Sequence, residues 1–180
     1  EAAFQLPFIV ADHETRELRV ALHRDDGGTR FIISSESDGE LTEHVTGIIG
    51  PSQWTGDTLS LDQLDARCQL GEQLFNDPDH HPHLDFGPRW ASLEKVAIGQ
   101  SEALIRLSMA PEYQQELAEF RLHPALLDMA TAGAQVIIDG HDPQAEVYVP
   151  VGYGHLRFSG ELSGQMVSHV CFKPADDGKH

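Results

Sequence analysis

A single acidic residue, Asp128, interrupts an otherwise apolar segment, and this feature constrains the fold of the chain most strongly. The segment Pro124–Ile138 is apolar or small at nearly every position and is followed by Asp139-Gly140. Proline suits the first helical position, where the N–H group that it lacks has no partner, and Asp-Gly is typical of a helix end. A helix without a clear polar face is buried on most sides. The sequence therefore predicts a central helix that other elements surround.

Two interpretations of Asp128 follow from this position. An ionised carboxylate is costly to bury unless it is paired or protonated. The nearby helix N-terminus favours the anion, whereas burial favours the neutral acid. Carboxylates in such surroundings are frequent at active sites, and they also occur in structural networks. The residue pattern alone leaves both a chemical and a structural role open.

Length and charge limit the classes of protein to which the chain can belong. Its 180 residues suffice for one domain or two small ones with a real core. The 29 acidic residues outnumber the 12 basic ones and give a formal charge of −17, which repels phosphate backbones and predicts no binding to nucleic acid. No apolar run reaches membrane-spanning length, and no secretory signal is visible, so no membrane partner is expected.

The first residue of the chain and its two cysteines indicate the kind of protein to which it belongs. The sequence opens on Glu1 without an initiator methionine, so we expect it to be a piece of a longer protein. Cys68 and Cys171 lie far apart in dissimilar contexts. Two free thiols in a reducing cytoplasm are therefore expected in preference to a disulfide.

Alternating segments near the start of the chain predict a β-meander. Apolar residues occupy every second position of Glu17–His23, and a turn at Asp25–Gly28 leads into Arg30–Ser34 and then His44–Ile49. Alternation and Gly-rich turns are typical of antiparallel hairpins. Because residues 1–50 contain no helix to cover their apolar face, we expect them to be the last strands of an incomplete unit.

Residues 51–83 are predicted to link this meander to a second unit. Ser60 and Gln63 form a capping-box pattern, which predicts a helix over about residues 60–75. The polar, proline-punctuated residues that follow predict a loop. This loop offers metal ligands, but they come from one short segment instead of from separated rigid elements, so no metal site is predicted there; the ligands are His80, His81 and His83 with Asp77 and Asp79.

A second β-rich region over residues 84–180 contains the apolar helix. We expect strands at residues 93–98, 103–109, 146–149, 155–159 and 166–173. One long helix among antiparallel strands indicates the α+β class, with a sheet that wraps the helix.

The segment Leu84–Trp90 has an unusual composition for a connection. Gly87-Pro88 forms a rigid bend between two large aromatic residues, Phe86 and Trp90. Aromatic side chains mostly pack, so a packing corner is one interpretation. The wall of an apolar channel is the other.

Three stretches of the sequence, in this order, resemble motifs of the dehydratase domain of modular polyketide synthases. Leu84–Trp90 resembles the Gly-Pro-centred motif of that family, and His123–Asp128 resembles its His-Pro-Ala-Leu-Leu-Asp motif. Tyr148–Phe158 resembles the segment that follows the catalytic helix, and Leu61–Cys68 resembles the helix between the two halves of the domain. The likeness covers most of the chain and indicates the C-terminal portion of such a domain.

This resemblance implies a fold and an activity. The fold is a double hot dog, in which each half is a long helix wrapped by an antiparallel sheet; residues 84–180 are expected to form the second hot dog. The activity is the removal of water from a β-hydroxyacyl thioester to give an α,β-unsaturated thioester. A histidine of the first hot dog takes the α-proton, and Asp128 protonates the departing hydroxyl group. The acid role agrees with an apolar environment, which favours a neutral, proton-donating carboxyl group.

The resemblance also implies partners and a set of site residues. The substrate is presented on the phosphopantetheine arm of an acyl carrier protein, and no cofactor is expected. The other synthase domains are expected as partners, the complete synthase is expected to be a homodimer, and its location is expected to be the cytoplasm. Beside the catalytic Asp128, the residues expected to bind substrate are Phe86, Gly87, Pro88, Trp90, His123, Pro124, Leu127, Thr131, Ala132 and Gln135. The bend with its two aromatic residues would line the acyl tunnel.

The sequence departs from the family pattern in its histidines. The family places its catalytic histidine in a His-x-x-x-Gly-x-x-x-x-Pro motif, which His13, His23 and His44 do not match. We therefore expect the base to lie upstream of Glu1 and this chain alone to expose an apolar sheet face.

A second departure lies one helical turn after Asp128. The family usually carries Gln or His there, and this chain carries Ala132. Thr131 is a candidate substitute, whereas Gln135 lies about 10 Å along the helix axis from Asp128 and is a poor one. Ala132 keeps one alternative function open, a dehydratase-like isomerase or cyclase. The missing histidine motif keeps open another, a catalytically silent domain for docking or structure.

Overall fold

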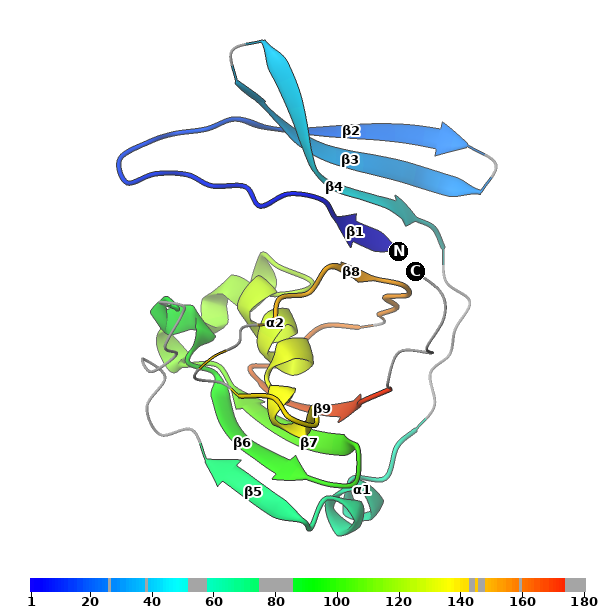
Figure 1. Cartoon of the computed structure of the whole chain (residues 1–180), viewed down its shortest axis with the longest axis vertical. Helices are drawn as coiled ribbons and strands as arrows, with labels where there is room; N and C mark the ends of the chain where they lie inside the picture. Colours follow the sequence, from blue (N-terminus) through cyan, green and yellow to red (C-terminus); the bar gives the residue numbers. More distant parts are fainter. Residues whose placement is uncertain are drawn as a thin grey trace. The chain divides into compact units, whose positions relative to one another are not determined.

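The computed structural model describes residues 1–25, 27–37, 39–51, 58–74, 86–142, 145, 148–158 and 160–173. The chain divides into two compact units, which we call unit 1 (Glu1–Gly56 with Val149–Ser159) and unit 2 (Asp57–Tyr148 with Gly160–His180). Each unit contains one antiparallel sheet (Figure 1). None of the helices in the described ranges has both the length and the apolar character needed to cross a bilayer.

Unit 1 is a sheet with the strand order β2-β3-β4-β1-β8. The predicted meander is confirmed, since consecutive strands β2, β3 and β4 pair antiparallel. The strands of this sheet are β1 (Ala2–Phe4), β2 (Leu18–Asp25), β3 (Gly28–Ser37), β4 (Glu40–Ile49) and β8 (Gly152–Tyr153).

A glycine allows an aromatic ring to lie across β4. Gly47 is the register partner of Phe31. A Cβ atom at position 47 would come within 2.5 Å of the Phe31 ring, so the ring occupies space that a larger residue would need. Glycine at this position thus lets the Phe31 ring cover the strand.

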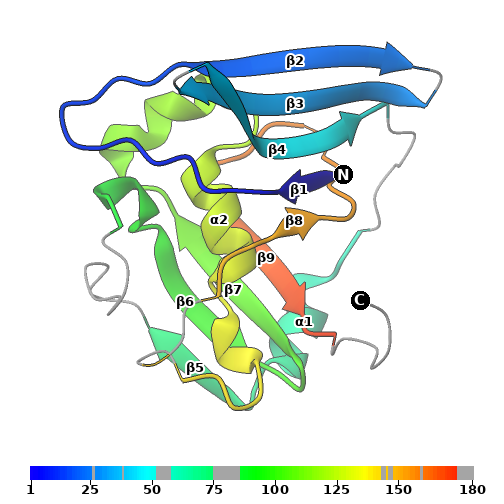
Figure 2. The ribbon, with the colours of Figure 1, turned by 45° about the horizontal axis from the view of Figure 1, so that its top comes forward.

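β1 lies between β4 and β8 and joins two distant parts of the sequence (Figure 2). In register, Ala2 is opposite Gly47 on one side and Tyr153 on the other. Strands were expected at residues 146–149 and 155–159, but residues 148–149 and 155–158 form none, and residues 146, 147 and 159 lie outside the described ranges. The strand forms at β8 instead, after Pro150, which lacks the N–H group needed for a sheet hydrogen bond.

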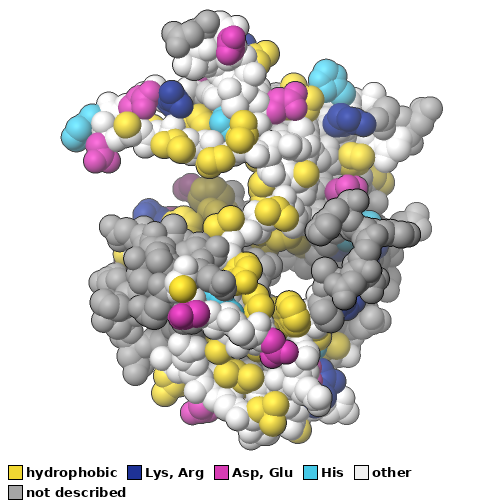
Figure 3. Space-filling view, viewed as in Figure 1, with side chains coloured by type: hydrophobic (Ala, Val, Ile, Leu, Met, Phe, Trp, Pro, Cys, Tyr) yellow, Lys and Arg dark blue, Asp and Glu magenta, His cyan; other side chains and the backbone are white. Residues whose placement is uncertain are grey.

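One face of the unit 1 sheet carries exposed apolar side chains, as expected from the sequence. Leu18, Val20 and Leu22 alternate along β2 and are 47%, 62% and 63% exposed. Their register partners on β3 include Phe31 and Ile33, which continue the apolar face. Hydrophobic side chains accordingly lie at the surface of the meander (Figure 3).

Within its described residues, unit 2 joins a four-stranded sheet, order β5-β6-β7-β9, to two α-helices and three short 3₁₀ helices, and it is of the predicted α+β class. The strands are β5 (Gly71–Leu74), β6 (Leu93–Ile98), β7 (Glu102–Ser108) and β9 (Gln165–Cys171). The helices are α1 (Leu61–Arg67), η1 (Pro88–Trp90), η2 (Pro111–Ala118), α2 (Pro124–Ala132) and η3 (Gln135–Ile137).

Both predicted α-helices begin as expected and end early. The hydroxyl of Ser60 accepts a hydrogen bond from the Gln63 amide, but α1 ends at Arg67 instead of near residue 75, because residues from Gly71 onward pair with β6 as a strand. The prediction of a helix to Ile138 was also wrong, since α2 ends at Ala132. Glycine at 133 and the β-branched residues that follow it disfavour further α-helix.

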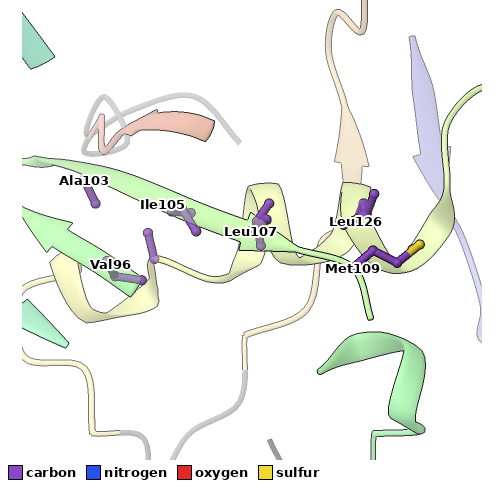
Figure 4. Packing of buried hydrophobic residues seen from close by; sticks show 7 residues of the cluster. Val96, Ala103, Ile105, Leu107, Met109 and Leu126 are labelled. Carbon is purple, nitrogen blue, oxygen red and sulfur yellow. The ribbon is translucent and has the colours of Figure 1, made fainter. Parts of the chain in front are cut away.

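The core of unit 2 lies between α2 and one face of its sheet. Alternate residues of β7 point toward the helix and pack with residues of β6 and α2 (Figure 4). Seven buried residues form this cluster: Val96, Ala103, Ile105, Leu107, Met109, Leu126 and Ala134. On the opposite face Leu64 and Cys68, from α1 and its C-cap, pack with Ala97 and Leu104. Both cysteines of the chain are free thiols.

Leu126→Ala should destabilise unit 2 by about 2–5 kcal/mol, since it removes a side chain that is fully buried between α2 and the sheet. Urea unfolding followed by circular dichroism measures the change. Leu70→Ala, at a position 73% exposed, should change the free energy of unfolding by less than about 0.5 kcal/mol. Equal losses in the two variants would contradict the described packing.

Candidate active site

The helix α2 sets the position of Asp128 relative to the core. Leu126 is fully buried in the core cluster against the sheet, and Ala125 is also fully buried. At about 100° per residue, Asp128 lies about 160° around the helix from Leu126 but only about 60° from Ala125, at the border of the buried face. The residue is accordingly half-buried.

The carboxyl group of Asp128 accepts a hydrogen bond from a tryptophan. The indole Nε1 of Trp90 donates to Oδ2 of Asp128 over 2.8 Å. Among the described residues, no donor bonds the second oxygen, Oδ1. The carboxyl group thus has one oxygen held by the protein and one oxygen available to a ligand.

The Gly-Pro bend places this tryptophan. Pro88 occupies the first position of η1, and the carbonyl of Gly87 accepts a hydrogen bond from the Trp90 amide at 3.0 Å. Phe86 stacks on Trp90, with ring centroids 6.4 Å apart and an angle of 25° between the planes. The structure therefore brings the predicted bend and the predicted acid together, although 38 positions separate Trp90 from Asp128.

The residues suggested as substitutes for Gln or His at position 132 do not contact the Asp128 carboxyl group. Thr131 is exposed, and its hydroxyl donates to the backbone carbonyls of Leu127 and Asp128. The side chain of Gln135 donates to the carbonyl of Tyr148 over 3.0 Å. Ala132 is half-buried and has no polar side-chain atom, so the described donor to the carboxyl group is Trp90.

The remaining predicted residues of α2 lie around its first turn. Pro124 is exposed and Leu127 is half-buried. His123, the N-cap residue, is only 1% exposed, and its ring meets Phe120 edge-on at 5.5 Å between centroids. His123 is thus packed inside unit 2, whereas the carboxyl group of Asp128 lies at the border of the buried face.

An ion-pair network, Arg89–Glu116–His123, connects η1, η2 and the start of α2. Arg89 donates to both carboxylate oxygens of Glu116 at 2.6–3.0 Å, and Nε2 of His123 donates to Oε2 at 3.2 Å. The hydrogen bonds from Arg89 and from His123 lower the pKa of Glu116 to about 2. Arg89 also lies 4.7 Å above the ring of Tyr113, a cation–π contact.

No pattern in the sequence marks Arg89 or Glu116 as members of this site. Both are ordinary charged residues, and 27 positions separate them. Their link to Trp90 and Asp128 arises only when η1, η2 and α2 pack together, so periodicity and spacing could not reveal it.

A histidine of unit 1 is held by its own strands. Both ring nitrogens of His44 are engaged, since Nε2 lies 2.8 Å from Oγ of Ser35 and Nδ1 lies 3.1 Å from the carbonyl oxygen of Leu6. His44 is buried and meets Phe8 edge-on. These contacts give it a structural role.

One group of described residues has the chemistry of metal ligands. Glu102, His169 and Cys171 place one ligand atom each within 4.8 Å of one another. Hydrogen bonds from His169 and Arg67 lower the pKa of Glu102, and Arg67 donates to both of its carboxylate oxygens at 2.9 and 3.1 Å. Because the guanidinium of Arg67 already supplies the positive charge, we interpret the group as an ion-paired cluster. The histidines of the loop, from His80 to His83, lie outside the described residues.

Comparisons with known proteins concern most of the chain. Residues 57–178 match the family model described as the polyketide synthase dehydratase N-terminal domain. The polyketide synthase PksM of Bacillus subtilis is 29% identical over 132 residues, which are 68% of this chain and 3% of that synthase.

Solved structures resemble the fold at lower identity. A trans-AT polyketide synthase dehydratase domain from Brevibacillus brevis is 22% identical, with a TM-score of 0.69, over 79% of this chain and 52% of that one. The CurK dehydratase domain of the curacin polyketide synthase is 20% identical, with a TM-score of 0.72, over 96% of this chain and 62% of that one. Inactive mutants of CurK dehydratase have been solved with a histidine replaced by phenylalanine and with an aspartate replaced by asparagine. This chain spans about half to three fifths of the length of these solved chains. Their common fold is the predicted hot dog.

Glu116→Gln should weaken the protein at neutral pH and have no effect at strongly acidic pH. The pKa of Glu116, about 2, lies below the ordinary value of 4.5, so the ionised carboxylate stabilises the fold above about pH 4.5, and this stabilisation is lost as the pH falls toward 2. Urea midpoints of wild type and variant at several pH values measure the difference. Glu119→Gln, at an exposed residue next to η2, is the matched control and should show no such pH-dependent difference. A Glu116→Gln effect that persists unchanged down to about pH 2 would argue against the ion pairs.

Proposed function

Because this chain belongs to the polyketide synthase dehydratase family, we propose that it supplies the proton-donating part of a domain that removes water from a β-hydroxyacyl thioester. The whole-domain activity, its substrate and its partners are part of this proposal, since the chain spans 52% to 62% of the solved dehydratase chains described above. Asp128 is the general acid.

The carboxyl group of Asp128 is the observation that carries the proposal. It is half-buried on α2, Trp90 holds Oδ2, and Oδ1 has no donor among the described residues. A neutral carboxyl group in this arrangement presents an O–H to a ligand while its other oxygen stays fixed. Hydroxide is a poor leaving group, so elimination needs a proton donor of this kind.

The elimination balances with one acid and one base. The acid proton moves from Oδ1 of Asp128 to the β-oxygen, and the C–O bond breaks with its electron pair on oxygen, so that water leaves. The electron pair of the α-C–H bond becomes the second bond of the alkene, and the α-proton goes to the base. The ionised Asp128 then regains a proton for the next turnover.

We assign the base to a histidine outside the described residues of this chain. Within unit 1, His44 is buried with both ring nitrogens engaged, which disfavours it as a base. The inactive CurK mutants, one at a histidine and one at an aspartate, support a His–Asp pair in that relative. For the present chain, the same chemistry requires a partner that faces Asp128 across the substrate.

The setting of the reaction follows from the same family. Relatives such as PksM are synthases of which this region is about 3%, so other synthase domains are its neighbours. We propose that an acyl carrier protein presents the substrate on its phosphopantetheine arm, that no further cofactor takes part, and that the domain works as a homodimer in the cytoplasm. Phe86 and Trp90 offer an apolar, aromatic wall for the acyl chain beside the acid.

The alternative functions are less well supported. Ala132, which carries no polar group one turn after Asp128, suggested an isomerase or a cyclase, and the missing histidine motif suggested a silent domain. Trp90 supplies a polar neighbour to Asp128 from another element. The family match, which is to dehydratases, and the retained Asp128 both favour dehydration.

Asp128→Asn in the complete dehydratase domain that contains this chain should lower the rate of water loss by about 10²–10⁴-fold, because the amide supplies no acidic proton. The loss of 18 Da from a β-hydroxyacyl group on an acyl carrier protein, followed by mass spectrometry, measures the rate.

Asp139→Asn is the matched control for this experiment. Asp139 is an exposed aspartate in the turn after η3, and the same substitution there should leave the rate unchanged. Undiminished turnover in Asp128→Asn would remove Asp128 from the mechanism.

A further inference from the structure

We propose that Trp90 is a positioning residue that decides which oxygen of Asp128 carries the acid proton. The inference rests on the proposed function of Asp128 as a general acid. An indole N–H is a donor and has no acceptor capacity. Since Nε1 of Trp90 donates to Oδ2 at 2.8 Å, Oδ2 must accept in both protonation states of the carboxyl group. The proton of the neutral acid therefore resides on Oδ1.

Several contacts around Trp90 fix the direction of this donor. The amide of Trp90 donates to the carbonyl of Gly87, and the carbonyl of Trp90 accepts from the amide of Ser92 at 2.7 Å. Ser92 is 1% exposed, and its carbonyl accepts from the amide of Ser108, the last residue of the core strand β7. Phe86 stacks on the indole. Both the backbone and the ring of Trp90 are thus held by neighbouring groups.

The ion-pair network holds Trp90 and Asp128 in position relative to each other. Arg89, the residue before Trp90, donates to both carboxylate oxygens of Glu116, and Glu116 bonds His123 at the N-cap of α2. The path from Trp90 through these three residues ends on the helix that carries Asp128. Bidentate pairs of arginine and carboxylate have a fixed geometry, so the network limits rotation of η1 against α2.

Position 132 offers a direct test of this role. Side chains on an α-helix lean toward its N-terminus, and residues four apart are neighbours, so a side chain at 132 leans toward Asp128. Ala132 is half-buried and carries no donor. A glutamine there can supply an N–H to the carboxyl group from α2 itself, in place of the indole.

The first experiment replaces the donor in the complete dehydratase domain. Trp90→Phe keeps an aromatic ring for Phe86 to stack on and removes the N–H. We expect kcat for water loss to fall about 10- to 100-fold, the usual effect of losing a hydrogen bond to a charged or reacting group, with KM changed less than about twofold. An unchanged kcat in Trp90→Phe would overturn the proposal.

The second experiment tests rescue. Trp90→Phe combined with Ala132→Gln should recover most of the lost kcat, whereas Trp90→Phe combined with Ala132→Met, similar in length but without a donor, should not. Recovery in both double variants would show that lost volume caused the defect and would contradict the proposal. Recovery in neither would contradict it as well, because a donor on α2 would then be unable to replace the indole.

A spectroscopic measurement separates this inference from the proposed function. The indole Nε1–H signal of Trp90, assigned through Trp90→Phe, should shift upfield in Asp128→Asn and stay in place in Asp139→Asn. If this shift is seen but Asp128→Asn still turns over, the proposed function fails while the hydrogen bond stands. If Asp128→Asn is inactive but the signal does not shift, the positioning role of Trp90 fails alone.

Discussion

The packing of α2 against one face of the unit 2 sheet is the constraint on which the site depends. Leu126 is fully buried in that contact and Ala125, beside it on the helix, is also fully buried, so the rotation of the helix about its axis is fixed. Once the rotation is fixed, Asp128 can only emerge at the border of the buried face. A carboxyl group deeper in the core would have no access to a ligand, and one on the far side of the helix would be fully hydrated. The apolar contact at Leu126 thus determines how far the carboxyl group of Asp128 is exposed to a ligand.

The site is assembled by short elements that have little stability of their own. η1 and η2 are 3₁₀ helices, a form that is rarely long because its hydrogen bonds are poorly aligned. Arg89 and Glu116 tie these two helices together, and His123 ties them to α2. The order of the acid site therefore relies on charged side chains at least as much as on backbone hydrogen bonds. Protonation of Glu116, as the pH falls toward 2, removes this support.

The parts of the fold that could be predicted from the sequence are those with a local physical cause. Alternation in β2 and β3 reflects a sheet with one apolar face, and the proline at 124 marks the start of α2. The end of α2 was misjudged because apolar character continues past Gly133 even though helix propensity does not. The two-residue strand β8 is too short to leave a periodic signal.

The residues of the acid site could be predicted from the sequence, but the contact between them could not. Asp128 was found from its contrast with apolar neighbours, and the Gly-Pro bend from its composition. Their hydrogen bond was not, because no local rule connects residues 38 positions apart. Trp90 was expected to line an apolar tunnel, and its polar N–H group turned out to matter as well. An amphipathic side chain such as tryptophan has two chemical uses, and only tertiary packing decides which one applies.

The pairing of β8 with β1 has a consequence for how this region can be exchanged between synthases. One sheet is made from two stretches of the gene that lie far apart, since Ala2 is opposite Tyr153. A recombination junction between residues 56 and 149 would bring these two stretches from different parents, and the short edge strand would face a foreign neighbour. Evolution by module swapping, and engineering that imitates it, should therefore keep residues 2–153 together.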